Sequence, residues 1–270
     1  MKLSIITINK NNAAGLEKTI QSVVCQTYSD FEYIVIDGAS VDGSLEIIKK
    51  YADKINYWVS ETDTGIYNAM NKGIRQAIGE YCLFLNSGDY LIENNSLKYI
   101  FSIITGDADI YYCDCLYAMI PKTLNVNKLI QSPISHQNSI IKRHLFIEHG
   151  YYNEEFIISS DYEFFLKEIW KFKTNFRHIP MTLSFYEGHG ISATNISLRE
   201  KERKLVFSNV FNEISDSIIE YFYFNKTIYA DIIRKCGNSL ILNFILRAYR
   251  FIAKRLFRKK DYLELWEHFE

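Results

Sequence analysis

Residues 34–44 read IVIDGASVDGS, an apolar β-rich run that ends in a polar turn with two glycines. The run starts at Phe31 and ends at Ile36, and the turn leads into residues 44–51, whose apolar side chains have helical spacing. A strand that passes through a short turn into a helix is the building unit of parallel sheets covered by helices. Asp37 would then lie at the carboxyl end of a strand, the edge at which such sheets bind ligands.

The same alternation of strand and helix continues on both sides of this segment. Further strands are predicted at residues 3–8, 55–59 and 81–85, and further helices at residues 15–25 and 66–78. This order predicts an α/β fold with a mostly parallel sheet flanked by helices. Residues 100–200 are less regular apart from a predicted helix at 162–170. We therefore expect residues 1–200 to form the sheet domain and residues 201–270 a helical, basic C-terminal extension.

Charge is distributed unevenly along the chain. The 270 residues include 31 Lys+Arg and 32 Asp+Glu, a formal net charge of -1, and 48% are hydrophobic, an ordinary globular composition. This composition excludes a disordered or collagen-like chain, and the near-neutral total gives no reason to expect a nucleic-acid partner. Residues 232–260 nevertheless carry nine cations and no acid, which leaves -10 on the rest of the chain.

The basic segment, residues 232–260, has a helical pattern with two different faces. Within residues 240–257 one face is apolar and the other carries cations, as in helices that lie in a membrane interface. We predict contact with an anionic membrane surface; the alternative is a helix docked on the body with a solvated cationic face. No stretch reaches the roughly 18 uncharged apolar residues of a membrane span. The expected location is the cytoplasm, peripheral to the inner face of the cytoplasmic membrane.

A second polar cluster follows the strand predicted at residues 81–85. Residues 86–89 read NSGD, and Asp89 is the kind of carboxylate that holds a divalent cation bridging a diphosphate, while Gly88 permits close approach. A polar turn after a strand is common, so this cluster alone is weak evidence. In the same way, Asp37 can hydrogen-bond a base or a sugar, or it can simply close an Asx turn.

The spacing of four segments makes the evidence stronger. They are residues 4–7 (SIIT) with 26–28 (QTY), residues 36–44 (IDGASVDGS), residues 60–73 (SETDTGIYNAMNKG), and residues 79–81 (GEY) leading to 86–89 (NSGD). Together they resemble family 2 glycosyltransferases with the GT-A (Rossmann-like) fold, in a subgroup of bacterial surface-polysaccharide biosynthesis. The resemblance covers roughly residues 1–200, which would form the GT-A catalytic domain.

The resemblance implies a nucleotide-diphosphate sugar as donor and a divalent cation, Mg²⁺ or Mn²⁺, as cofactor. Asp89 matches the last carboxylate of the family's metal-binding motif. This sequence departs from the commoner pattern because Gly38 replaces an acid, and because Asn86 and Gly88 replace the acids before Asp89. The residues that match the family's donor site are Thr7, Asp37, Asp63, Asn71, Ser87 and Gly88.

Another carboxylate stands where the helix predicted at 162–170 would begin. Residues 158–163 read ISSDYE, and a capping role for Asp161 is one interpretation. The resemblance implies instead that Asp161 is the general base that takes the proton of the acceptor hydroxyl. Glu163 is the rival, but on a helix it projects about 200° away from Asp161 and is expected to be structural.

Two histidines lie in segments that resemble the walls of the family's cleft. His136 stands in residues 135–138 (SHQN) and is expected to contact the diphosphate or the acceptor; a structural histidine is the alternative. His189 stands in residues 187–192 (EGHGIS), which resemble a segment that closes over the site. We expect His189 to reach the pyrophosphate or the metal.

These residues predict an inverting glycosyltransferase, hexosyl or N-acetylhexosaminyl, that uses a nucleotide-diphosphate sugar, with UDP the expected nucleotide. The acceptor would be a glycan or a lipid-linked glycan. A nucleotidyltransferase is one alternative, although it usually has a glycine-rich basic loop after the first strand, where residues 9–12 here read NKNN. The thinned acidic motif keeps a second alternative open, a catalytically degenerate subunit that binds nucleotide or glycan.

Overall fold

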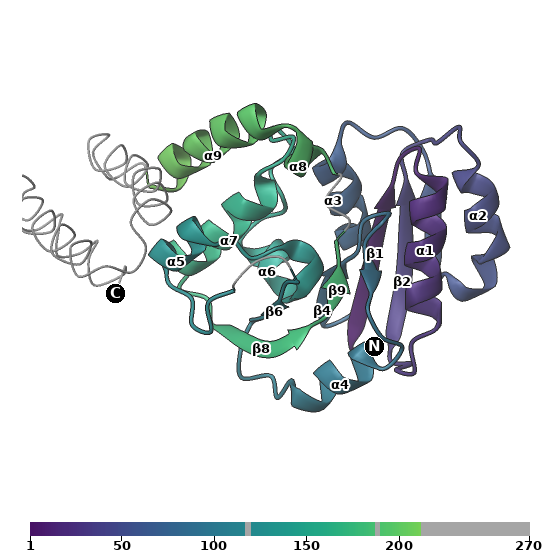
Figure 1. Cartoon of the computed structure of the whole chain (residues 1–270), viewed down its shortest axis with the longest axis horizontal. Helices are drawn as coiled ribbons and strands as arrows, with labels where there is room; N and C mark the ends of the chain where they lie inside the picture. The colour runs from purple at the N-terminus through teal and green to yellow at the C-terminus, as the bar shows by residue number, and fades with distance from the viewer. Residues whose placement is uncertain (117–119, 187–189, 212–270) are drawn as a thin grey trace, which may run out of the picture.

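The computed structural model describes residues 1–116, 120–186 and 190–211 (Figure 1). A seven-stranded sheet with the order β3-β2-β1-β4-β7-β6-β8 has helices on both faces, and β5 and β9 form a separate antiparallel pair. The strands are β1 (Leu3–Asn9), β2 (Phe31–Asp37), β3 (Tyr57–Ser60), β4 (Tyr81–Phe84), β5 (Tyr90–Leu91), β6 (Ile110–Asp114), β7 (Ser139–Lys142), β8 (Phe176–Thr182) and β9 (Ser184–Phe185). The helices are α1 (Ala13–Val24), α2 (Ser44–Lys50), α3 (Ile66–Gln76), α4 (Ser96–Ile103), α5 (Val126–Gln131), α6 (His144–Glu148), α7 (Ser160–Trp170), α8 (Ile191–Thr194) and α9 (Ile196–Val210).

The first half of the sheet is parallel, as predicted. β1 is buried along its whole length and pairs in parallel with β2 on one side and β4 on the other. Its register sets Asn9 opposite Asp37 at the carboxyl edge. Because β1 lies between β2 and β4, the strand order reverses there, which is where open α/β sheets form their ligand crevice. The α/β fold with a mostly parallel sheet is therefore confirmed.

Alternate residues of these strands fill two separate cores. Ile6, Ile34 and Phe84 face the layer of α3, α5, α6 and α7, whereas Ile5 and Val35 face the layer of α1, α2 and α4. Strands buried on both faces need continuous apolar runs, because successive side chains point to opposite sides. This requirement explains why the runs in the first third of the sequence were readable as strands.

The pairing of β6, β7 and β8, which form the other half of the sheet, does not follow from the sequence pattern. β7 inserts between β4 and β6 and is antiparallel to both, and β6 pairs in parallel with β8 through an irregularity near Cys113. The end of α4, and the whole of α5 and α6, lie within residues 100–200, for which the sequence pattern predicts no helix before residue 162. These elements depend on partners distant in the chain rather than on a local strand-to-helix repeat.

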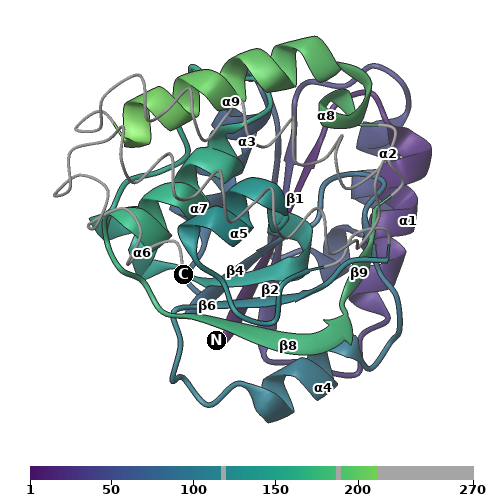
Figure 2. The same ribbon diagram turned by 60° about the vertical axis from the view of Figure 1, so that its left-hand side comes forward.

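The described chain ends with α9, which packs across α7 (Figure 2). The division predicted at residue 200 falls inside α9, so the body continues at least to Phe211, which is buried and packs on Trp170 at 5.1 Å between ring centres. The rest of the predicted extension, including the basic segment 232–260, lies outside the described residues. In the part of the chain that is described, no helix is long and apolar enough to cross a membrane.

Candidate active site

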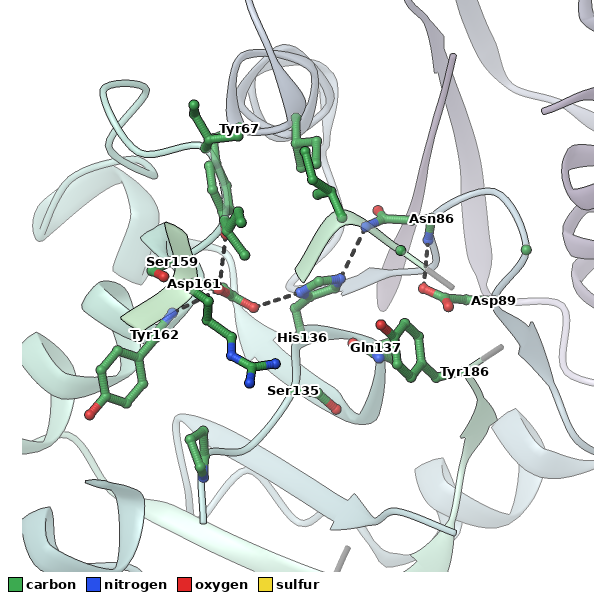
Figure 3. Close-up of a pocket in the computed structure, with 18 of the residues that line it drawn as sticks. Tyr67, Asn86, Asp89, Ser135, His136, Gln137, Ser159, Asp161, Tyr162 and Tyr186 are labelled. Carbon is green, nitrogen blue, oxygen red and sulfur yellow. Dashed lines mark hydrogen bonds and ion pairs between the residues drawn. The ribbon is translucent and has the colours of Figure 1, made fainter. Parts of the chain in front are cut away.

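A cavity of about 470 Å³ opens at the carboxyl ends of β1 and β4 (Figure 3). Residues 86–89 after β4, residues 133–137 before β7, the first turn of α7, and α9 contribute to its wall. Among the sequence-predicted site residues, the structure brings Ser87, Gly88, Asp89, His136 and Asp161 together in this cavity.

A chain of hydrogen bonds follows the cavity wall from Asp89 to Tyr67 (Figure 3). The Asn86 N–H donates to Asp89 Oδ2 at 3.2 Å, and the Asn86 side-chain nitrogen lies 3.1 Å from His136 Nε2. His136 Nδ1 lies 2.8 Å from Asp161 Oδ2, and the Tyr67 hydroxyl donates to Asp161 Oδ1 at 3.0 Å. Asp89, expected at the metal, and Asp161, the expected base, are thus connected through Asn86 and His136.

His136 and Asp161 shift each other's protonation in opposite directions. Burial lowers the pKa of His136, but the hydrogen bond to Asp161 and the charges of Asp161 and Asp89 outweigh burial, so the pKa is raised overall. Burial raises the pKa of Asp161, but the hydrogen bond and charge of His136, with hydrogen bonds from Tyr67 and the Tyr162 N–H, lower it overall. Opposite shifts are the signature of an ion pair, and they keep Asp161 ionised at neutral pH.

Asp161 lies in the first turn of α7, one position inside the helix. The helix begins at Ser160 with Ser159 as the capping residue, so the capping interpretation of Asp161 is wrong. A carboxylate in a first turn is still favoured by the helix dipole. Glu163 lies outside the cavity that contains Asp161, and its carboxylate pairs with Lys167 at 3.0 Å, which supports a structural role.

The two oxygens of Asp161 differ in how many donors they meet. Oδ1 accepts from the Tyr67 hydroxyl and from the Tyr162 N–H at 2.9 Å, whereas the hydrogen bond to Oδ2 comes from His136. A carboxylate oxygen has about two lone pairs. Oδ2 therefore keeps the capacity to accept one more proton donor from the cavity.

Asp37 is hydrogen-bonded to capacity within the protein. Its Oδ1 accepts from the Asn9 amide at 2.7 Å and the Ser40 hydroxyl at 2.6 Å; its Oδ2 accepts from the Ser40 N–H at 3.0 Å and the Ser60 hydroxyl at 2.6 Å. Burial raises the pKa of Asp37, but these hydrogen bonds lower it overall. Four donors fill the four lone-pair positions of the carboxylate. Asp37 therefore stabilises the turn after β2. A contact between Asp37 and the nucleotide-sugar would require one of these four hydrogen bonds to be exchanged.

Two more of the predicted donor residues are engaged inside the fold. The Asn71 amide nitrogen donates to the Tyr152 carbonyl and to Glu154, both at 2.8 Å, and its oxygen accepts the Tyr152 N–H at 3.1 Å. The hydroxyls of Thr7 and Tyr33 are hydrogen-bonded at 3.0 Å, and both side chains are buried. Neither Asn71 nor Thr7 lines the cavity that contains Asp161. Asn71 instead fastens α3 to the loop before α7.

Two glycines that depart from the commoner family pattern have steric reasons. A Cβ at Gly38 would clash with Asp63 Oδ2, so Asp63, which pairs with Lys10 at 3.7 Å, occupies the space that an acid at position 38 would need. Gly88 has a φ of 106°, a backbone conformation that side chains disfavour. The backbone at Gly88 therefore favours glycine, whereas a side chain at position 38 would have to displace Asp63.

Asp89 fits a divalent cation through its chemistry rather than through a ready-made cluster. In the part of the chain that is described, no group of three or more acidic, His or Cys side chains is placed to hold a metal. However, Asp89 is buried, and within the described residues the amide oxygen of Asn86, three positions earlier in the same turn, is buried without a hydrogen-bond partner. One carboxylate with an amide oxygen, completed by phosphate oxygens and water, matches the way Mg²⁺ binds at phosphate sites. The predicted Mg²⁺ or Mn²⁺ is compatible with these residues.

The cavity also contains residues that the sequence did not single out. Tyr67 lies within residues 60–73, and Asn86 stands where the commoner family pattern has an acid; the sequence pattern predicts no role for either side chain. Arg199 and Arg203 of α9 line the cavity as well. Their spacing of four residues, on one face of a helix, was the signal that could have revealed them. His189 lies outside the described residues, so its predicted role stays a prediction.

Curated proteins similar to this chain are glycosyltransferases by name. The chain is 30% identical over 203 residues to the PGL/p-HBAD biosynthesis glycosyltransferase of Mycobacterium tuberculosis (strain ATCC 25177 / H37Ra), covering 71% of this chain and 79% of that protein. It is 35% identical over 118 residues to the cholesterol galactosyltransferase of Borreliella burgdorferi, covering 43% of this chain and 33% of that protein.

Solved structures share the fold at low sequence identity. The chain matches S. aureus TarS with a TM-score of 0.67 and 20% identity, covering 89% of this chain but 46% of that longer chain. It matches the mannosyltransferase PcManGT of Pyrobaculum calidifontis, solved with GDP-Man and Mn²⁺, with a TM-score of 0.63 and 17% identity, covering 93% and 80% of the two chains. These matches agree with the predicted GT-A type of sheet.

The match to a family covers nearly all of the seven-stranded sheet. Residues 4–180 match the sequence model of the family described as "Glycosyl transferase family 2", a span that runs from the start of β1 into β8 and includes Asp89, His136 and Asp161. The structure and the sequence thus agree on one assignment: the chain belongs to glycosyltransferase family 2.

Proposed function

We propose that this protein moves a sugar, with inversion, from a nucleotide-diphosphate sugar to a hydroxyl of a glycan or lipid-linked glycan. The observation that carries the proposal is the ion pair of Asp161 and His136 inside the cavity that also contains Asp89. Such a transfer needs a base for the acceptor hydroxyl and positive charge for the departing diphosphate. In the cavity, Asp161 is suited to act as the base, and Asp89 is suited to hold a cation that supplies the positive charge.

In the proposed reaction Asp161 is the general base. Asp161 Oδ2 takes the proton of the acceptor hydroxyl while that oxygen forms a bond to the anomeric carbon of the sugar. The bond from the anomeric carbon to the diphosphate breaks in the same step, and the nucleoside diphosphate leaves. His136 and Tyr67 hold the carboxylate in one orientation before the step. A cation held by Asp89 and the Asn86 amide oxygen would supply charge stabilisation to the leaving diphosphate.

For the donor we favour a UDP-sugar. TarS 1-349 of S. aureus was solved with UDP-GlcNAc, and PcManGT with GDP-Man and Mn²⁺, which supports a nucleotide-sugar donor on this fold. Testing UDP-, GDP- and dTDP-sugars in turn distinguishes the transfer of a hexosyl group from that of an N-acetylhexosaminyl group. The proposed donor contacts are Thr7, Asp37, Asp63, Asn71, Ser87 and Gly88, with His189 at the pyrophosphate. Of the first six, Ser87 and Gly88 line the cavity, whereas Asp37 and Asn71 would have to exchange internal hydrogen bonds to contact the donor.

For the acceptor, the name of one relative includes a lipid, cholesterol. One relative is named for PGL/p-HBAD biosynthesis and another for cholesterol galactosylation. The basic segment 232–260, with nine cations, would hold this protein at the anionic inner face of the cytoplasmic membrane, since each basic residue near such a surface contributes about 1 kcal/mol. Both features are compatible with a lipid-linked glycan as the acceptor.

The proposal is tested by incubating the purified protein and Mn²⁺ with UDP-, GDP- and dTDP-sugars and identifying the products. We expect release of a nucleoside diphosphate, and we expect Asp161→Asn to lower the rate by a factor of about 10²–10⁴ while UDP still binds. Glu163→Gln, which removes a carboxylate two residues away and outside the cavity, is the matched control. Full activity of Asp161→Asn would disprove the base assignment. Pyrophosphate as the product would indicate nucleotidyl transfer, and donor binding without turnover a binding subunit.

A further inference from the structure

The cavity has a cationic end that the proposed chemistry does not use. Arg199 and Arg203 lie one helical turn apart on α9, and both line the cavity wall. Residues four apart on a helix share a face, so the two guanidinium groups reach the same side of the cavity. The positive charge at this end of the cavity therefore comes from α9.

α9 is fastened to the loop that precedes the base. The Glu202 carboxylate accepts the Ile157 N–H at 2.7 Å and the Ile158 N–H at 2.9 Å. Val206 and Phe207 on the same helix are buried in the core shared with α7. Because Glu202 adjoins Arg203 in sequence, these bonds fix the backbone of α9 at Arg203 against the loop that leads to Asp161.

Arg203 has unused hydrogen-bonding capacity. Its guanidinium carbon lies 5.0 Å from the centre of the Tyr162 ring, a cation–π contact. Its Nε is buried without a hydrogen-bond partner, and no ion pair of Arg203 occurs within the described ranges. A buried donor that meets no acceptor is costly to the fold. The Arg203 guanidinium therefore has a donor that an anion bound in the cavity could satisfy.

The position of Arg203 associates it with the acceptor rather than the donor. Figure 3 shows Asp89 and Tyr162 on opposite sides of His136 and Asp161. The diphosphate of the donor is expected at Asp89, whereas Arg203 contacts Tyr162, the residue that follows the base. The acceptor must approach the base, so the cationic end faces its path.

Apolar side chains border this cationic end. Ile157 and Ile191 line the cavity, yet 51% and 43% of their surfaces are exposed. Exposed isoleucines beside arginines fit a ligand that has an anionic group next to an apolar one. A neutral sugar alone would leave both features without a partner.

From these observations we infer that Arg203, with Arg199 beside it, binds a phosphate group carried by the acceptor. The inference rests on the proposed glycosyl transfer and narrows its acceptor to a phosphate-bearing one. A guanidinium offers paired donors that match two phosphate oxygens, and two arginines match the charge of a phosphate better than that of a carboxylate. The phosphate can belong to a lipid-linked glycan or to a soluble sugar phosphate, and the test distinguishes these sources.

The test measures binding of small probes to the full-length protein saturated with UDP and Mn²⁺, so that the donor end is filled. Hexyl phosphate, hexanoate and hexyl glucoside share one alkyl chain and differ in the head group, and glucose 1-phosphate has phosphate without the chain. Calorimetry should show hexyl phosphate binding at least about tenfold more tightly than hexanoate or hexyl glucoside. Arg203→Ala should weaken that binding about tenfold or more and leave UDP binding unchanged.

Two further variants make the result decisive. Lys201→Ala removes an exposed cation from the same helix and should leave hexyl phosphate binding unchanged. Arg203→Lys keeps the charge without the paired donors and should fall between wild type and Arg203→Ala. Arg203-dependent binding of glucose 1-phosphate would support a soluble source, and dependence on the alkyl chain a lipid-linked one. Unchanged hexyl phosphate binding in Arg203→Ala, tighter binding of hexanoate, or an equal loss of UDP binding would overturn the inference. Failure of UDP to bind the wild type would instead count against the proposed function.

Discussion

Replacing His136 by alanine should weaken the fold and disturb the base together. His136 Nδ1 lies 2.8 Å from Asp161 Oδ2, and the two side chains are only 16% and 18% exposed. The substitution leaves Oδ1 with its donors from Tyr67 and Tyr162 but removes the His136 donor from Oδ2. A mostly buried carboxylate would then have lost its cationic partner.

The expected loss of stability follows from the contacts that disappear. A hydrogen bond to a charged group contributes about 1.5–3 kcal/mol. The edge-on contact between His136 and Phe84, at 6.5 Å between ring centres, adds about 0.5–1 kcal/mol. Because the carboxylate keeps some solvent contact, water replaces part of the lost bond, and we expect about 2–3 kcal/mol in total. For a domain of this size that corresponds to a Tm lower by roughly 4–12 °C.

The loss of stability in His136→Ala should be larger at mildly acidic pH than at alkaline pH. The pKa of His136 is raised, so its contribution is complete below the ordinary histidine pKa and is lost as the pH rises through the raised value. The pKa of Asp161 is lowered, so its contribution is complete above the ordinary carboxyl pKa and is lost as the pH falls through the lowered value. The wild type should therefore exceed the variant most between about pH 4 and 6.5, and less at about pH 9.

Thermal unfolding of the wild type and His136→Ala, followed by circular dichroism at about pH 5, 7 and 9, measures this difference. His144→Ala is the control, because His144 is exposed and its contact with Glu148 at 3.5 Å lies on the surface, where such pairs contribute about 0–1 kcal/mol. Equal midpoints for the wild type and His136→Ala near pH 5, or a difference that does not shrink at alkaline pH, would refute the pairing argument.

Three further predictions concern the cation, a glycine and the membrane. Asp89→Asn should abolish the strengthening of UDP binding by Mn²⁺ without unfolding the protein, as titrations with and without the ion would reveal; an unchanged Mn²⁺ effect would exclude this carboxylate. Gly38→Ala should destabilise by about 1–3 kcal/mol in urea unfolding because its Cβ meets Asp63, and an unaltered midpoint would contradict the steric argument. Replacing Arg250, Lys254 and Arg258 by glutamine should weaken co-sedimentation of the full chain with anionic vesicles at low salt, whereas equal sedimentation would rule out the electrostatic contact.

The fold was predictable where local pattern and long-range pairing agree. In the first 85 residues each strand leads into a helix and on to the next parallel strand, so periodicity alone located β1 to β4. β7 breaks this rule, because it joins the sheet antiparallel between β4 and β6, strands that precede it by more than 20 residues. Short strands of that kind have no local signature, since the distant partners decide their pairing.

For the site, too, the sequence predicted candidate residues but not their partners in the folded protein. The resemblance to the family singled out Asp37, Asp63, Asp89 and Asp161 as candidate carboxylates, and all four lie within the residues that match the family model. It could not show that Asp37 already has four internal donors. Nor could it show that the amide of Asn71 is bound to the backbone of Tyr152 and to Glu154.

By itself the sequence determined the α/β class, the ligand-binding edge of the sheet and the family, because these follow from local periodicity and from the order of short motifs. Only the tertiary structure decided which side chains are free to act. Tyr67 and Asp161 are 94 positions apart, and Asn86 and His136 are 50 apart. Whether a carboxylate, an amide or a guanidinium keeps an unfilled hydrogen-bonding position depends on such distant partners. That is why Arg203 and the His136–Asp161 pair emerge only when the chain is folded.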